Sequence, residues 1–164
     1  MGIEVHNNKS LRLDNVLIKQ IFNTIEEDDV AENESEDFLE IVVEQMENQI
    51  KSKGAHSVGP LIQYSGLEYG NEEMNISVSL MLQADRYINN PDPGYRMEPV
   101  IKVPGCMYLR FEGREEDLHI AYKKIEVDAY ENDIDLKGNS YTIFVDAADD
   151  GNIVADIFME KENG

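Results

Sequence analysis

Hydrophobic and polar positions alternate most regularly in residues 74–83. One side of this stretch carries Met74, Ile76, Val78, Leu80 and Leu82, and the other carries Asn75, Ser77, Ser79, Met81 and Gln83. Side chains of a strand point alternately to its two faces, so the pattern predicts a strand with the first set against the core. Runs rich in apolar, β-branched and aromatic residues predict further strands at 16–25, 58–64 and 100–111. We expect a kink at Pro104, because proline lacks the amide hydrogen that a central strand donates.

Two other segments carry apolar residues at the spacing of a helix. In residues 35–53, Ser35 can cap the first turn, acidic side chains follow it, and Gly54 suits the end. In residues 115–132, one stripe contains Leu118, Ala121, Tyr122, Ile125 and Ala129. The sequence therefore predicts two helices, each with one apolar face.

The last part of the chain predicts two strands, 141–145 and 153–159, joined by a polar turn. By alternation, Tyr141, Ile143 and Val145 share one face of the first strand. We expect this face to lie in the core, with the odd-numbered residues of 153–159 and with 74, 76 and 78. The opposite faces would then form the wall of a groove: Ser77, Ser79, Met81, Cys106, Tyr108, Arg110, Thr142, Phe144, Asp156 and Phe158.

The order of the predicted elements repeats along the chain. Strand, helix, strand and strand occur in 11–84 and again in 100–164, with a proline-rich connector at 85–99. The sequence thus predicts one α+β domain, 11–164, in which pseudo-twofold duplicated β-α-β-β units form a concave antiparallel sheet with two helices on one face. Residues 1–10 are polar, and we expect a disordered lead-in or the remnant of a removed segment.

Charge narrows the classes of partner. The 164 residues include 34 acidic and 14 basic side chains, which gives a formal net charge of -20. DNA binding requires clustered Lys and Arg, so direct nucleic-acid contact is not expected. A negative surface favours a cationic small molecule or a basic protein, although acidic residues that only keep the domain soluble explain the same charge. With no membrane-spanning apolar run, no signal peptide and a single cysteine, we expect a soluble cytoplasmic protein.

Motifs for cofactor, metal or covalent chemistry are not found in the sequence. There is no phosphate-binding glycine loop and no nucleophile elbow, so no cofactor is expected. The three histidines lack metal-ligand spacing, and residues 146–157 fit a hairpin turn better than a calcium loop, because Ile157 stands where a glutamate is needed. Cys106 belongs to no Cys-His motif, so we expect a packed thiol and no catalytic residue.

The segment from Gly105 to Gly113, the helix after it and the strand from Tyr141 to Asp146 resemble a known family. In element order the likeness extends over residues 16–160. The chain is similar to the gyrase-inhibitor-like effector-binding domain, found at the C-terminus of multidrug-responsive MerR-type and some AraC-type bacterial transcription regulators and also as stand-alone proteins. This resemblance implies two β-α-β-β units and a central cleft that accepts flat, hydrophobic and often cationic drugs between aromatic rings.

The resemblance also implies where a ligand would bind. In the best-known members of the family a buried glutamate on the penultimate strand meets the positive charge of the ligand, whereas this chain has Thr142 there, so Asp156 or another acid would have to replace it. The expected ligand-binding residues are Tyr64, Tyr108, Arg110, Thr142, Phe144, Asp156 and Phe158. The aromatic members can stack on a ligand or pack on the sheet, and Arg110 can bind a ligand carboxylate or pair with Asp156 or Glu112.

We therefore expect the domain of a bacterial transcription regulator that senses hydrophobic, drug-like molecules, cationic ones included. It would be either a fragment whose DNA-binding part lies upstream or a protein that has lost that part. One alternative is a stand-alone module that binds a basic protein, as a gyrase inhibitor would. The other is a small hydrolase that uses the same cleft. The length of the intact reading frame distinguishes the sensing domain from the stand-alone module, and turnover by an Asp156→Asn variant tests the hydrolase.

Overall fold

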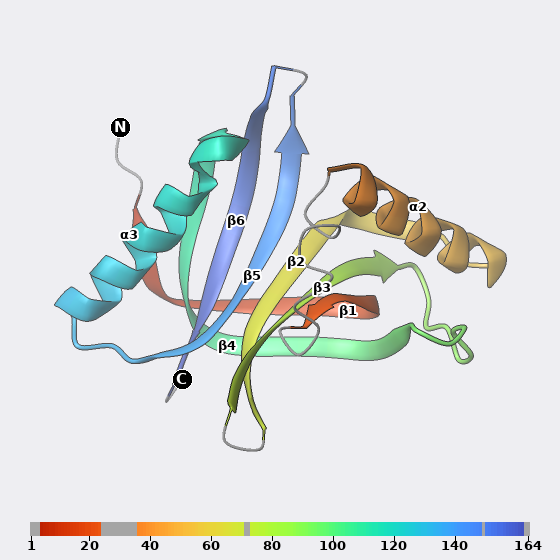
Figure 1. Ribbon diagram of the computed structural model, residues 1–164, viewed down its shortest axis with the longest axis horizontal. Coiled ribbons are helices and arrows are strands. Elements are labelled where there is room, and N and C mark those ends of the chain that lie inside the picture. Colours follow the sequence, from red (N-terminus) through yellow and green to blue (C-terminus); the bar gives the residue numbers. More distant parts are fainter. Residues whose placement is uncertain (1–3, 24–35, 71–72, 149, 163–164) are drawn as a thin grey trace. The chain divides into compact units, whose positions relative to one another are not determined.

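The computed structural model describes residues 4–23, 36–70, 73–148 and 150–162 (Figure 1). Its elements are β1 (Val5–Asn23), α2 (Glu36–Ser52), β2 (Ser57–Gly70), β3 (Glu73–Ala84), β4 (Arg96–Arg114), the 3-10 helix η2 (Glu115–Asp117), α3 (Leu118–Glu131), β5 (Leu136–Ala147) and β6 (Asn152–Lys161). The strands form an antiparallel sheet in the order β1-β3-β2-β5-β6-β4. The predicted α+β class and the repeated β-α-β-β element order are therefore confirmed.

The chain divides into two compact units, and three strands contribute residues to both. The first unit contains Leu13–Gly59 and Gln63–Ile101. The second unit contains Met1–Arg12, Pro60–Ile62 and Lys102–Gly164. The pseudo-twofold pairing of two halves around one concave sheet stays a prediction.

In the first unit, β1 pairs antiparallel with β3, and Leu17 lies opposite Leu82. Leu80, Met81 and Leu82 are all buried, as are Val16, Leu17 and Ile18 of β1. The predicted inward face of β3 is wrong in part: Ile76 is 42% exposed, whereas the neighbouring Ser77 is buried. Alternation identifies the inner face only where the other face meets water, and much of β3 is buried on both faces.

The connector between β3 and β4 is fixed to the end of α2. The side-chain amide of Gln49 donates a hydrogen bond to Asp92 Oδ2 (3.0 Å), and the Asp92 amide nitrogen donates one to Gln49 Oε1 (2.9 Å). Lys53 Nζ also lies 3.1 Å from Asp92 Oδ1. Helix α2 contributes Val42, Met46 and Ile50 to the core of the unit at helical spacing. Ser35, the predicted cap of this helix, lies outside the described residues.

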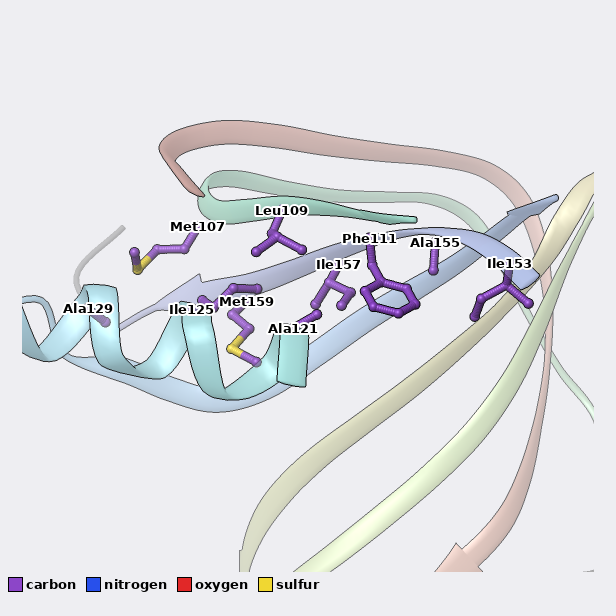
Figure 2. Close-up of a cluster of buried hydrophobic side chains, with 10 residues drawn as sticks. All are labelled: Met107, Leu109, Phe111, Ala121, Ile125, Ala129, Ile153, Ala155, Ile157 and Met159. Carbon is purple, nitrogen blue, oxygen red and sulfur yellow. The ribbon is translucent and has the colours of Figure 1, made fainter. Parts of the chain in front are cut away.

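In the second unit, α3 packs on β4 and β6 (Figure 2). The buried cluster consists of Met107, Leu109, Phe111, Ala121, Ile125, Ala129, Ile153, Ala155, Ile157 and Met159. The register aligns three strands here: Leu109 of β4 lies opposite Ile157 of β6, and Ile157 lies opposite Thr142 of β5. The predicted inward face of the last strand and the predicted apolar stripe of the helix are confirmed.

The face predicted for β5 is wrong. Phe144 lies opposite Ala155 and packs against the buried cluster, so Thr142 and Phe144 share the face that meets α3. Tyr141 and Ile143 lie opposite Phe158 and Asp156, on the other face. Both faces of β5 carry bulky side chains, so alternation alone did not distinguish inside from outside; the register with β6 does.

The start of β1 differs from the prediction, and the middle of β4 refines it. Strand β1 begins at Val5, where we expected a disordered lead-in, and Lys161 Nζ donates a hydrogen bond to the Asn7 carbonyl oxygen at 2.6 Å. Polar side chains on residues 5–10 do not prevent a strand, because their backbone groups supply the pairing. In β4, Gly105 has a φ of 65°, and both Cys106 and Met107 after it are buried, so alternation breaks next to the predicted kink.

Candidate functional site

An aromatic and charged cluster lies in the second unit, on the face of β4 and β6 that points away from α3; in it Phe158 is buried, Tyr108 is half-buried and Arg110 is exposed. Tyr108 lies opposite Phe158 in the sheet, and Arg110 lies opposite Asp156. The Tyr108 and Phe158 ring centroids are 4.9 Å apart, with an angle of 43° between the planes. We call these four residues the Tyr108 face. All four were predicted to bind a ligand, and the register brings them together.

The Asp156 carboxylate is the centre of the hydrogen bonds on this face. Arg110 donates to it twice, from Nε to Oδ1 at 2.8 Å and from Nη2 to Oδ2 at 2.9 Å. The Tyr108 hydroxyl donates to Oδ1 at 2.6 Å. Burial would raise the pKa of Asp156, but the bonds from Arg110 and Tyr108 outweigh it and hold that pKa below its ordinary value. Of the roles predicted for Arg110, the internal pair with Asp156 is the one that forms.

The two donors of the hydrogen bonds to Asp156, Tyr108 and Arg110, also have raised pKa values. Burial, followed by the bond to Asp156, raises the pKa of Tyr108 to about 12. The bond to Asp156 also raises the pKa of Arg110 above its ordinary value. At neutral pH the face therefore holds a neutral phenol, a guanidinium and a carboxylate. Arg110 remains accessible, with 49% of its side chain exposed, whereas the Asp156 side chain is only 15% exposed.

Two residues of β1 that were not predicted as site residues also lie at Tyr108. Lys9 Nζ is 4.8 Å from the centre of the Tyr108 ring, and the His6 ring centroid is 5.9 Å from it. Lys9 also contributes to the low pKa of Asp156. No local signal marks these residues, because only the tertiary fold brings the start of β1 to β4. Both lie within residues 1–10, the segment that the sequence predicted to be disordered or a remnant.

The remaining predicted site residues lie elsewhere. Thr142 is 1% exposed, and its hydroxyl is hydrogen-bonded to the Tyr122 hydroxyl of α3. Burial raises the pKa of Tyr122. Phe144 shares the helix-facing side of the sheet with Thr142. Tyr64 belongs to the first unit, where its side chain covers Gly66 so closely that a Cβ at that glycine would collide with the ring.

Cys106 is a fully buried thiol, as its packed role predicted. Its Sγ lies 3.4 Å from the Val103 carbonyl oxygen and donates a hydrogen bond to it. Burial, together with the nearby Glu160 carboxylate, raises the pKa of Cys106 to about 11. The residue is therefore a neutral thiol at physiological pH, unlike an activated nucleophile.

No helix in the described part of the chain combines the length and the apolar character that a membrane span requires. Neither a protein-family model nor a curated protein sequence matches the chain. Solved structures do match. The fold is similar to the EcmrR C-terminal domain, with a TM-score of 0.68 and 14% identity over 99% of each chain.

Two further structures share the fold. The chain is similar to EcmrR in its complex with DNA, with a TM-score of 0.62 and 15% identity; 97% of the present chain is covered, but it spans only 57% of that EcmrR chain. It is also similar to SAV2435 bound to tetraphenylphosphonium, with a TM-score of 0.54 and 10% identity over 96% of this chain and 94% of that one. These likenesses confirm the fold that the family resemblance implied.

Proposed function

We propose that this chain is the small-molecule-sensing domain of a bacterial transcription regulator. The observation that carries the proposal is that the fold matches the EcmrR C-terminal domain over 99% of both chains. EcmrR as a longer chain forms a complex with DNA, and SAV2435 of the same fold binds tetraphenylphosphonium. The domain would therefore contribute ligand recognition, and a separate domain would contact DNA.

We place the ligand on the Tyr108 face. The half-buried Tyr108 ring, with the buried Phe158 ring packed 4.9 Å from it, offers an apolar platform. The mostly buried Asp156 carboxylate, with Arg110 beside it, fixes the orientation of polar groups. Thr142 and Phe144 leave the proposed site, because they face α3. Tyr64 stays a predicted ligand-binding residue of the first unit.

Regulation would work through linkage. A ligand that binds the Tyr108 face more tightly in one state of the regulator shifts the population toward that state by its difference in affinity. The net charge of -20 disfavours direct contact between this chain and DNA phosphates, so the readout belongs to the DNA-binding domain.

The chemistry of the described residues supports binding over catalysis. Asp156 holds three hydrogen bonds from its own neighbours, and Cys106 is protonated and buried. A general base or a nucleophile needs a lone pair directed at the substrate. Asp156 is instead an ion-paired carboxylate with a lowered pKa, and Cys106 is a buried neutral thiol, so neither side chain is activated in this way.

Ligand-dependent thermal stability tests the proposal. We would record unfolding by circular dichroism with three probes of related shape: tetraphenylphosphonium, the neutral triphenylphosphine oxide and the anion tetraphenylborate. A ligand at a hundred times its Kd adds about 2.7 kcal/mol, which raises the Tm of a chain of this size by about 5–10 °C. No shift with any of the three probes would refute a small-molecule site.

A pair of tyrosine variants locates the site. Tyr108→Ala removes a ring from the platform, and we expect it to abolish most of the shift. Tyr130→Ala removes the same side chain from an 85% exposed position on α3, and we expect the full shift to remain. Equal shifts in both variants would place the ligand away from the Tyr108 face.

A further inference from the structure

The charges around the Tyr108 face do not resemble those of a cation site. A receptor for a lipophilic cation offers an unpaired carboxylate and an open aromatic ring. Here Asp156 accepts three hydrogen bonds through both of its oxygens, two of them from a guanidinium. Its negative charge is already matched by Arg110 at 2.8 Å, so it has little attraction left for a second cation.

A cation of the chain itself already lies over the Tyr108 ring. Lys9 Nζ lies 4.8 Å from the ring centre, where the cation of a ligand would otherwise sit. A cationic ligand would have to displace this ammonium or approach it against like-charge repulsion. The same ammonium, together with the exposed half of Arg110, offers N–H donors to an anion.

The acidic side chains near the Tyr108 face do not cancel the positive charge that Lys9 and Arg110 present. Glu160 lies on β6 and is paired with Lys137, whose Nζ is 2.7 Å from its Oε2. Glu112 follows Arg110 by two residues along β4, about 7 Å further from Tyr108. The net charge of -20 acts over longer distances, but at physiological ionic strength it is screened beyond about 8 Å.

We infer that the Tyr108 face selects an aromatic anion, such as an aryl carboxylate, over an aromatic cation, with Lys9 and Arg110 as the recognising groups. The inference rests on the proposed function, and it distinguishes this chain from SAV2435, which was solved with a phosphonium cation. In this arrangement a phenyl ring of the ligand lies against the accessible part of Tyr108, beside Lys9, and the negative charge meets the ammonium and the exposed guanidinium N–H groups of Arg110.

Tetraphenylborate and tetraphenylphosphonium test the inference directly, because four phenyl groups surround the central atom in both and only the sign of the charge differs. We would measure both by isothermal titration calorimetry in a sodium buffer, since the potassium salt of the borate precipitates. We expect the borate to bind about tenfold more tightly, because reversing the sign of the ligand turns a modest attraction into a repulsion of similar size.

Two lysine variants test whether Lys9 causes the preference for the anion. Lys9→Gln should reduce the ratio of the two affinities at least about threefold, mainly by weakening borate binding. Lys123→Gln removes the same charge from an exposed position on α3 and should leave the ratio unchanged. An equal effect of the two variants would mean that only the overall charge matters, and would overturn the assignment to Lys9.

The remaining outcomes separate this inference from the proposed function. Tighter binding of the phosphonium would overturn the inference and leave the sensing function intact. Binding of neutral triphenylphosphine oxide alone would have the same meaning. If all three probes fail to bind, both proposals fall.

Discussion

The buried hydroxyl pair between Thr142 and Tyr122 allows a double-mutant test of the helix–sheet contact in the second unit. Tyr122→Phe and Thr142→Val each remove one hydroxyl while nearly preserving shape. Thr142 is 1% exposed, so in Tyr122→Phe its hydroxyl loses its partner in a place that water does not reach. A buried hydroxyl left without its hydrogen bond costs about 1–3 kcal/mol of unfolding free energy.

The other two corners of the cycle should behave differently. Thr142→Val leaves the Tyr122 hydroxyl without this partner, but Tyr122 is less buried than Thr142, so we expect a smaller loss of about 0.5–1.5 kcal/mol. In the double variant no orphaned hydroxyl remains, and the stability should lie close to that of Thr142→Val. The two losses are therefore non-additive by about 1–3 kcal/mol, the loss expected for Tyr122→Phe alone.

Equilibrium unfolding in urea, followed by far-UV circular dichroism for all four proteins, measures the cycle. Tyr130→Phe is the matched control, because it removes the same hydroxyl from an 85% exposed tyrosine of α3 and should change stability by less than about 0.5 kcal/mol. Additivity of the two single losses to within about 0.3 kcal/mol would refute the hydrogen bond and the reasoning built on it.

Three further predictions follow from the described contacts. Ile125→Ala should lower the unfolding free energy by about 2–5 kcal/mol, whereas Val127→Ala on the exposed side of α3 should change it by less than about 0.5; similar losses would contradict the orientation of the helix. In an absorbance titration Tyr108 should ionise near pH 12, and Asp156→Asn should lower that pKa; titration at the ordinary tyrosine value would disprove the contact. Because the folded pKa is the higher one, the stability that Tyr108 contributes is complete below the ordinary tyrosine pKa and is lost as the pH rises toward about 12. Gln49→Ala should speed proteolysis within the connector without loss of helix signal, and an unchanged cleavage rate would show that its two hydrogen bonds do not hold this segment.

The sequence predicted what depends on local spacing. The element order, the inward face of β6 and the apolar stripe of α3 each follow from a period within a few residues. The four residues of the Tyr108 face were also selected correctly as neighbours, because two of them alternate on β4 and two on β6.

What the sequence did not predict depends on register and on distant pairing. Thr142 and Phe144 were assigned to the wrong face because β5 is bulky on both sides, and only its alignment with β6 decides between them. Lys9 and His6 were missed because a polar segment becomes a strand when a partner far along the chain supplies the hydrogen bonds. No local window contains that partner.

The contact between Lys161 and the Asn7 carbonyl joins residues that are 154 positions apart. During synthesis β1 leaves the ribosome well before β6, because the other elements of the domain lie between them in the sequence. The Tyr108 face needs both, so a nascent chain that still lacks residues 156–158 has Lys9 but neither Asp156 nor Phe158. If the Tyr108 face binds the ligand, as proposed, recognition requires β6 as well as β1, and a ligand cannot act as a template for folding until β6 has been synthesised.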